Sequence, residues 1–314
     1  MVKTTKHARQ QRRERAAQAA RRRAWRRWTP ILGALVLVAA VALLGATRLL
    51  GDEDDAARAM ALYQFQTQDF HSLAFDPSDA DTIFFGHHGG LMISQDGGVS
   101  WQESTLQDVD AMQLALPAGG QRRYAAGHDV FYVSADGGAT WRSQPTNLPG
   151  LDLHVFAGSQ SDPDRLYTIP LGFGLYTSAD GGASWQEATL PPLSETQPMP
   201  IAVAPDEPET ILLARSGEIA TSRDAGMTWE REPGPSGIIT ALSVATGDLK
   251  TLYAGTTEGV FRRTGDGWEA LPIETDGAAV AIAASLSEPG RIAILDQQGN
   301  VYRSDDGGAS WAGR

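Results

Sequence analysis

Cysteine is absent from all 314 residues of the chain, so no disulfide bond can stabilise it. Beyond residue 60 the sequence also lacks the 3.6-residue hydrophobic period of amphipathic helices. A hydrophobic core must therefore supply the stability, and the roughly 250 residues beyond the N-terminal region are enough to form one. The missing helical periodicity leaves β-structure as the source of that core.

Basic residues are scarce after the first fifty positions. Residues 52–314 carry 14 Lys or Arg against 37 Asp or Glu, whereas residues 1–29 carry eleven Lys or Arg against one acid, Glu14. The formal net charge of −12 hides these two opposed parts. An acidic surface repels phosphates, so we expect no nucleic-acid partner for the larger part of the chain.

One long apolar run, the 17 uncharged residues 31–47, lies between Pro30 and Arg48. This length is at the lower end of what a membrane-spanning helix needs, about 17–25 apolar residues. Trp25 and Trp28 precede it beside an arginine cluster, as in an interfacial aromatic belt with positive residues on the cytoplasmic side. The alternative is a cleaved signal peptide, for which the only small-residue site, near residues 45–46, is poor.

These patterns predict four parts for the chain. We expect a basic cytoplasmic tail over residues 1–29, a single transmembrane signal-anchor helix in contact with membrane lipid over residues 30–50, and an acidic linker over residues 51–59. Residues 60–314 then lie outside the cytoplasm of a bacterial cell.

An eight-residue motif recurs along this last part. Copies begin at Ser94 (SQDGGVSW), Ser134, Ser178, Ser222 and Ser304, and a degenerate copy covers residues 263–268. Their aspartates are spaced by 40 to 44 residues and are Asp96, Asp136, Asp180, Asp224, Asp266 and Asp306. Each repeat has room for four short strands separated by turn signals, which is typical of a propeller blade.

The repeat count predicts an all-β fold, a six-bladed β-propeller with four-stranded antiparallel blades. Residues 60–67 would close the ring by pairing with the last blade. The last repeat also has an outer strand of its own near Trp311, so the sequence leaves open which segment closes the ring. A seven-bladed ring, in which residues 60–67 help to build another blade, is the alternative.

The motif itself has a mechanical explanation. Two glycines permit the positive φ of a tight hairpin between a blade's third and fourth strands. The aspartate accepts N–H bonds across that turn, and the tryptophan packs between blades. We therefore predict that all six aspartates are structural. The fourth copy has Ala225 in place of its first glycine, and in the fifth copy one residue separates Asp266 from Trp268, which requires a tighter or irregular hairpin.

The repeated S-x-D-x-G-x-[ST]-W motif resembles the bacterial neuraminidase repeat, or Asp-box, superfamily of sialidase-like β-propellers, over about residues 60–314. The single-pass arrangement with its His-His-Gly turn is similar to bacterial membrane-anchored proteins described as glycosylhydrolase-like. Members of the superfamily include sialidases, xyloglucan-active glycosidases, photosystem II assembly factors and sortilin-type receptors, so the resemblance implies a fold rather than a function. The sialidase Phe/Tyr-Arg-Ile-Pro motif is missing ahead of Ser94, and Arg58 is the only arginine between residue 52 and Ser94, so true sialidase activity is not expected.

Histidines and aspartates gather at matched positions of the first three repeats. In a propeller, the turns between second and third strands share one face with the blade-to-blade connections. Ligand sites of propellers commonly lie in a funnel on that face, around the central channel. The residues predicted there are His71, His87, His88, His128 and His154, with Asp69, Asp110 and Asp152. Phe173 is expected on the same face, where it would stack on a sugar ring or cap the blade edge.

Three functions remain open from the residues alone. The first is a binding or assembly module that recognises a glycan or protein partner through the funnel face. The second is a glycoside hydrolase with a pair of acids among Asp69, Asp110, Asp129, Asp152 and Glu258. The third is a propeller that binds a divalent metal through His71, His88, His128 and His154. No other cofactor is expected, and the plain alternative is a set of polar loop residues satisfied by solvent and backbone.

Overall fold

The computed structural model describes residues 59–67, 69–191, 199–265 and 267–312. The predicted basic tail, the membrane helix and all but the last residue of the linker lie outside these ranges. Within them, no helix is both long and apolar enough to cross a membrane.

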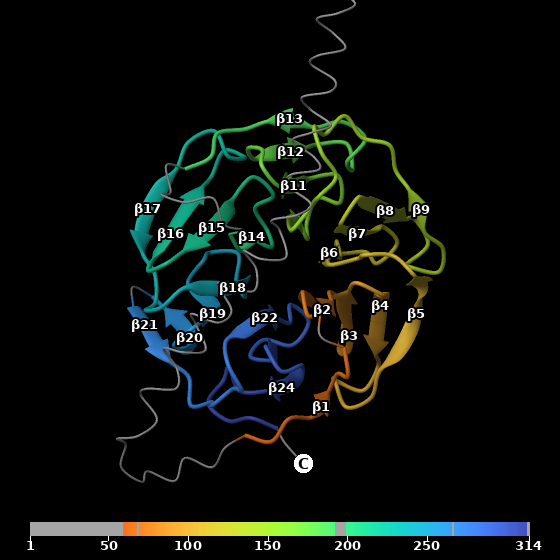
Figure 1. Ribbon diagram of the computed structural model, residues 1–314. Coiled ribbons are helices and arrows are strands. Elements are labelled where there is room, and N and C mark those ends of the chain that lie inside the picture. The colour runs from red at the N-terminus through yellow and green to blue at the C-terminus, as the bar shows by residue number, and fades with distance from the viewer. Residues whose placement is uncertain (1–58, 68, 192–198, 266, 313–314) are drawn as a thin grey trace, which may run out of the picture. The chain divides into compact units, whose positions relative to one another are not determined.

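Six antiparallel sheets of four strands each surround a common axis in the described part of the chain (Figure 1). Blade 1 contains β2 (Ser72–Asp76), β3 (Asp79–His87), β4 (Gly90–Ser94) and β5 (Gln102–Gln107). Blade 2 contains β6 (Gln113–Ala115), β7 (Arg123–Gly127), β8 (Val130–Ser134) and β9 (Arg142–Ser143). Blade 3 contains β10 (Val155–Gly158), β11 (Leu166–Ile169), β12 (Tyr176–Ser178) and β13 (Gln186–Glu187).

The second half of the ring repeats this order. Blade 4 contains β14 (Ile201–Val203), β15 (Ile211–Arg215), β16 (Glu218–Ser222) and β17 (Glu230–Pro233). Blade 5 contains β18 (Ile239–Val244), β19 (Thr251–Thr256), β20 (Gly259–Thr264) and β21 (Gly267–Ala270). Blade 6 contains β22 (Ala279–Ala284), β23 (Ile292–Asp296) and β24 (Asn300–Ser304), and takes its outermost strand, β1 (Tyr63–Gln64), from the start of the described chain. The prediction of a six-bladed propeller is confirmed.

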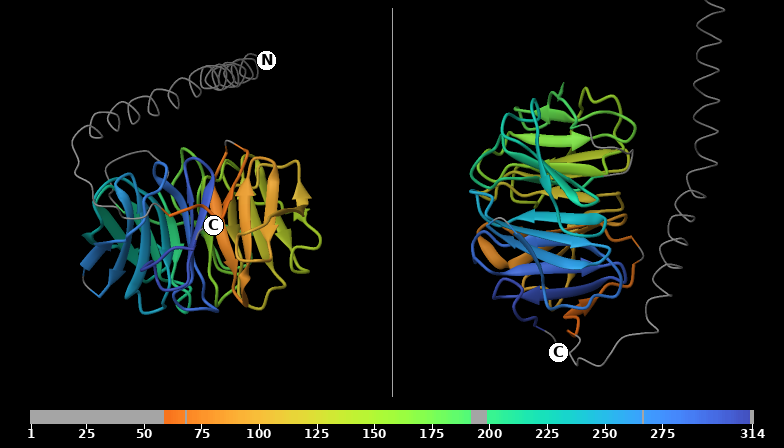
Figure 2. Two further views of the ribbon diagram at one scale, coloured as in Figure 1. Left: turned by 90° about the horizontal axis from the view of Figure 1, so that it is seen from below. Right: turned by 90° about the vertical axis from the view of Figure 1, so that its left-hand side faces the viewer.

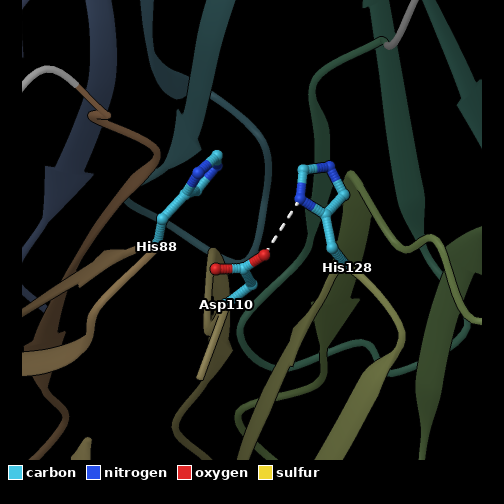
Figure 3. A group of neighbouring side chains, drawn as sticks. All are labelled: His88, Asp110 and His128. Carbon is cyan, nitrogen blue, oxygen red and sulfur yellow. Dashed lines mark hydrogen bonds and ion pairs between the residues drawn. The ribbon is translucent and has the colours of Figure 1, made fainter. Parts of the chain in front are cut away.

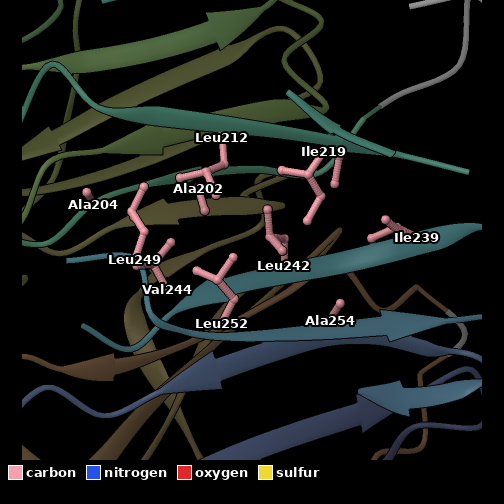
Figure 4. Close-up of a cluster of buried hydrophobic side chains, with 11 residues drawn as sticks. Ala202, Ala204, Leu212, Ile219, Ile239, Leu242, Val244, Leu249, Leu252 and Ala254 are labelled. Atoms are coloured by element: carbon pink, nitrogen blue, oxygen red, sulfur yellow. The ribbon is translucent and has the colours of Figure 1, made fainter. Parts of the chain in front are cut away.

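The hydrophobic core lies between adjacent blades. Between blades 4 and 5, for example, Leu212 and Ile219 pack with Leu242 and Leu252, and all four are buried (Figure 4). Each sheet is covered on both faces by its neighbours, so inner strands need apolar residues on both sides. The run 211–214 (ILLA) in β15 is accordingly fully buried, which explains why the sequence shows short continuous apolar runs rather than strict alternation.

The ring is closed by β1, which pairs with β24 in the register Tyr63 to Val301 and Gln64 to Asn300. Two backbone bonds extend the seam, from the N–H of Leu62 to the carbonyl of Val301 at 2.8 Å and from Phe65 to Gly299 at 2.9 Å. The strand that the sequence offers near Trp311 is reduced to one bridge between Arg303 and Ala312. The two segments thus share the outer edge of β24, which resolves how the ring closes and rules out the seven-bladed alternative.

Phe65 anchors this closure in the core. Its side chain is 4% exposed, and its ring stacks on Phe85 of blade 1 at a centroid distance of 4.0 Å and meets Trp101 edge-on at 5.0 Å. The residue therefore connects the closing segment of blade 6 to blade 1.

We expect Phe65→Ala to lower the free energy of unfolding by about 3–5 kcal/mol, because it removes a buried ring and leaves a cavity at the seam. Met60→Ala is the control, since Met60 is 60% exposed and should change stability by less than about 0.5 kcal/mol. Urea denaturation of the full chain measures both. Equal effects of the two substitutions would contradict this account of closure.

The aspartate hairpins, which follow the third strand of a blade, have one bonding pattern. In the first, Asp96 accepts from the N–H of Ser100 at 2.8 Å and from its hydroxyl at 2.6 Å, while Ser94 Oγ donates to Asp96 at 2.8 Å and accepts from the N–H of Gly98. The same bonds recur around Asp136, Asp180, Asp224 and Asp306. Bonds from Thr140 and Ser134 hold the pKa of Asp136 down at about 2. In all five hairpins the aspartate therefore accepts bonds that close its own turn.

Blades 4 and 5 depart from the pattern as the sequence indicates. Ala225 adopts φ 56° where the other copies have a glycine, and Trp229 donates its indole N–H to Thr189 of the preceding blade at 2.7 Å. In blade 5, Thr264 pairs directly with Gly267, so that hairpin is shorter than the others. Asp266 lies outside the described residues.

Replacing Ala225 by glycine should stabilise the protein by about 0.5–1 kcal/mol and raise its melting temperature by about 1–3 °C, because the left-handed conformation is strained for alanine. The neighbouring Gly226→Ala is the opposite test. It has φ 90°, and an added Cβ would lie 2.7 Å from Leu175 Cδ2, so we expect destabilisation. Calorimetry of both variants checks the pair, and a lower melting temperature for Ala225→Gly would contradict the strain.

Candidate functional site: an imidazole and carboxylate cluster on one face

The six inner strands β2, β6, β10, β14, β18 and β22 line the axis and contact one another around it. Each blade runs antiparallel from its inner strand outward, so turns between second and third strands lie on the face where the inner strands begin. We call this the funnel face. The aspartate hairpins lie on the opposite face. Figure 2 shows the ring of blades from the side, with the strands running between these two faces.

The structure contains a central cavity of about 170 Å³, lined by all six inner strands. Its lining includes Phe75, Val203 and Val244, which lie toward the ends of their strands and so toward the hairpin face. None of the histidines lines it. The cavity and the predicted polar cluster are therefore separate features, and the imidazoles and carboxylates belong to the cluster.

Backbone bonds between segments of different repeats position the cluster. The turn after β7 is paired with the connection between blades 2 and 3: Asp129 N–H donates to Leu151 at 2.9 Å and Leu153 N–H to Gly127 at 3.0 Å. This pairing sets His128 directly opposite Asp152. A similar bond of 3.0 Å joins Asp108 N–H to Gly89 in the first turn.

Gly127 fits closely against the connection between blades 1 and 2, which contains Asp110. A Cβ at this position would lie 1.6 Å from the carbonyl oxygen of Asp110, so only glycine is accommodated. The carbonyl of Asp110 thus rests on the strand that carries His128. This contact holds the carboxylate of Asp110 within reach of the imidazole.

Four imidazoles form a continuous row across blades 1 to 3. His71 and His88 stack in parallel with ring centroids 4.7 Å apart, His88 meets His128 edge-on at 5.2 Å, and His128 meets His154 edge-on at 4.6 Å. All four predicted histidines therefore come together, although they originate from three repeats.

Three carboxylates accompany the row. Asp110 Oδ2 lies 3.3 Å from His128 Nδ1, and Asp69 Oδ2 lies 3.8 Å from His88 Nδ1. His88, Asp110 and His128 converge on one space in the close-up, from two neighbouring blades (Figure 3). Each of these side chains is about one-third to one-half exposed, so the cluster is open to solvent at the mouth of the funnel.

The tightest group is formed by His128, Asp152 and His154. The two Nε2 atoms are 2.8 Å apart, and Asp152 Oδ1 lies 3.0 Å from Nε2 of His154 and 3.5 Å from Nε2 of His128. Asp152 Oδ1 is buried and, despite these short distances, is not aligned for a hydrogen bond. Nε2 of His71 and Nε2 of His88 are likewise buried without a hydrogen-bond partner.

Burial disfavours the imidazolium form in this cluster. It lowers the pKa of His71 to about 4, with the neighbouring imidazoles His88 and His154 adding to the effect. Burial also lowers the pKa of His154, against the opposing attraction of Asp152. Both rings are therefore neutral at physiological pH and offer lone pairs.

The remaining predicted residues are not members of this cluster. His87 stacks on Phe85 at 5.2 Å and accepts the N–H of Gly89 through Nδ1, which is a role within its own blade. Asp129 is exposed at φ 58°, and Glu258 is exposed in the equivalent turn of blade 5. Phe173 is 46% exposed, and its ring lies against Gly150 in the connection between blades 2 and 3.

Asp110 and Asp152 lack the open space that separates the two acids of a glycosidase. Such enzymes keep open space between two acids, about 5–5.5 Å for retention or about 6.5–9.5 Å for inversion. Asp110 and Asp152 instead flank the same imidazole ring, that of His128, which occupies the space where substrate or water would lie.

Sequence reasoning placed Asp69, Asp110 and Asp152 beside the histidines on one face, but it named the four histidines alone as metal ligands and Asp152 as a candidate catalytic acid. The spacing Asp152-x-His154 is a signal that would have shown more, because residues i and i+2 of an extended segment point to the same side. Asp69-x-His71 has the same spacing.

No family model matches the chain, and no curated relative matches it. Solved structures show a similar fold. A GH74 enzyme from Niastella koreensis is 17% identical with a TM-score of 0.52 over 75% of this chain and 36% of the enzyme, so this chain spans about a third of that protein's length. YCF48 from Cyanidioschyzon merolae is 15% identical with a TM-score of 0.52 over 82% of this chain and 88% of its own.

A structure of YCF48 bound to D1 peptide is also similar, at 16% identity and a TM-score of 0.50 over 79% of this chain and 83% of its own. At these identities the comparisons establish the β-propeller fold alone. Glycoside hydrolases and a peptide-binding protein share that fold, so function must be argued from the site.

Gly127→Ala should lower the free energy of unfolding by about 1–3 kcal/mol, because the added methyl overlaps the Asp110 carbonyl. It should also shift the imidazole ¹⁵N resonances of His128 as Asp110 moves away. Gly267→Ala is the matched control, since a Cβ there meets nothing within 4 Å. Unchanged His128 resonances in a folded Gly127→Ala protein would show that this contact does not position the site.

Proposed function

We propose that the protein is a binding propeller that recognises a partner through the funnel face of blades 1 to 3. In this proposal, residues 30–50 tether it to a bacterial cell membrane, residues 1–29 lie in the cytoplasm, and the propeller lies outside. The tether is supported by the apolar run and by the arginine cluster before it.

The observation that carries the proposal is the one-sided polar cluster. Four imidazoles and three carboxylates meet at the start of three neighbouring inner strands, whereas the equivalent inner-strand positions of blades 4 to 6 carry Met199, Thr240 and Val280. A structural ring needs no such asymmetry, because the blades are otherwise repeats. Hydrogen-bonding groups at a partly exposed mouth suit ligand recognition.

A protein segment is the partner class that the surroundings favour. The N–H of Leu171 donates to the carbonyl of Asp152 at 2.9 Å, so Leu171 adjoins the cluster, and it is 37% exposed. Phe173, two residues on, is 46% exposed. Apolar side chains beside polar anchors are the pattern that a bound peptide uses for affinity and orientation. The similar structure that contains a peptide supports the same class.

Hydrolysis is the weaker alternative, since His128 lies between Asp110 and Asp152. The exposed carboxylates Asp129 and Glu258 belong to separate turns in blades 2 and 5. We therefore assign no catalytic pair among the described residues.

Selection of a displayed peptide library against the full chain, in parallel with a glycan array and chromogenic glycosides, tests the proposal. We expect peptide ligands whose affinity falls at least about tenfold in a Leu171→Ala/Phe173→Ala variant, since anchors of an interface carry most of its energy. Ile238→Ala is the control, because Ile238 is 57% exposed and precedes the inner strand of blade 5.

Binding of a glycan and not of a peptide would change the proposed partner from a protein segment to a glycan. Glycoside hydrolysis that disappears in Asp152→Asn, or no ligand in either screen, would overturn the proposed function.

A further inference from the structure

We propose that His128, Asp152 and His154 bind one divalent transition-metal ion at the funnel face, with coordination positions left open toward solvent. This deepens the proposed function, on which it rests, by naming what the polar cluster holds.

The three ligand atoms have the separations that one ion requires. Bonds of about 2.0–2.1 Å at angles between 90° and tetrahedral place ligand atoms about 2.9–3.4 Å apart. The observed separations among Nε2 of His128, Nε2 of His154 and Oδ1 of Asp152 are 2.8, 3.0 and 3.5 Å. The group therefore needs only shifts of a few tenths of an ångström to bind an ion.

Hydrogen bonding alone does not satisfy this group. Asp110 Oδ2 lies 3.3 Å from Nδ1 of His128. In the tautomer whose Nδ1 hydrogen points at this carboxylate, Nε2 of His128 presents a lone pair toward His154 and Asp152. Nε2 of His154 has at most one hydrogen for two acceptors, His128 Nε2 and Asp152 Oδ1. In that tautomer, two lone pairs point at each other and repel, and a cation between them would relieve the repulsion.

Asp110 completes the pattern from outside the ligand set. Metal-binding histidines commonly donate their second ring N–H to a carboxylate, which fixes the tautomer and strengthens the ligand. Asp110 occupies this place toward His128, and Gly127 holds the Asp110 backbone against the same turn. Asp110 is thus a positioning residue rather than a ligand.

Ligand type defines the class of ion. Two imidazoles and one carboxylate, in a chain without cysteine, suit Zn²⁺, Cu²⁺ or a neighbouring first-row divalent ion rather than a soft monovalent one. Three protein ligands leave at least one position for water or for a donor group of the bound partner.

A second group, His88 with Asp110 and His128, also has ligand atoms within 4.8 Å of one another. It shares His128 with the first group, so we expect one ion per chain. His71 and Asp69 remain outside the ligand set, which revises the four-histidine site predicted from the sequence.

Isothermal titration of the full chain, first stripped with EDTA, with Zn²⁺ and separately with Cu²⁺ tests the inference. We expect one ion per chain, loss of that binding in Asp152→Asn and His154→Ala, and about 10- to 100-fold weaker binding in Asp110→Asn. Asp129→Asn is the matched control. It removes the same charge from the same face beside His128, and asparagine tolerates its φ of 58°.

Equal binding by Asp152→Asn and Asp129→Asn, two ions per chain, or no binding to the unsubstituted chain would each overturn the assignment. Circular dichroism shows that each variant is folded before titration. The peptide screen repeated in EDTA separates the two proposals, since peptide binding that survives there upholds the binding function even if the metal titration fails.

Discussion

The pairing of β1 with β24 is the constraint on which the rest of the structure depends. An open row of six sheets would expose the apolar faces of blades 1 and 6, and each blade is stable only between two neighbours. The closing strand is two residues long, so much of the seam's strength comes from Phe65, which is buried against Phe85 and Trp101 of the next blade. Closure fixes the angle between neighbouring blades, and the imidazole row spans three of them.

The same architecture separates stability from function by face. Aspartate hairpins stiffen the outer edge of five blades through bonds that each hairpin makes within itself. The funnel face does not carry these hairpins, and its turns differ from blade to blade. There, glycines and backbone bonds between repeats place polar side chains of blades 1 to 3 together. Repeats that are alike in their hairpins can therefore differ in what they bind.

The repeated motif made the fold predictable, because one supersecondary unit recurs with the same glycines, aspartate and tryptophan. The single residue between Asp266 and Trp268 also predicted the shorter hairpin of blade 5. Closure was only half predictable, since two segments competed for the edge of β24 and the sequence does not say which one takes more of it. The membrane helix stays a prediction, as residues 30–50 lie outside the described part of the chain.

Repeat alignment also predicted which histidines and aspartates share a face, but not how they divide into roles. That division depends on the bonds between residues 127–129 and 151–153, which join separate repeats and leave no local pattern.

The most direct measurement of the proposed metal site is anomalous X-ray diffraction at the zinc edge from crystals of the full chain grown with Zn²⁺. The account predicts one strong peak within about 2.2 Å of Nε2 of His128, Nε2 of His154 and the Asp152 carboxylate. A peak beside His71 and His88 instead, or zinc bound only to acids elsewhere on the surface, would contradict it.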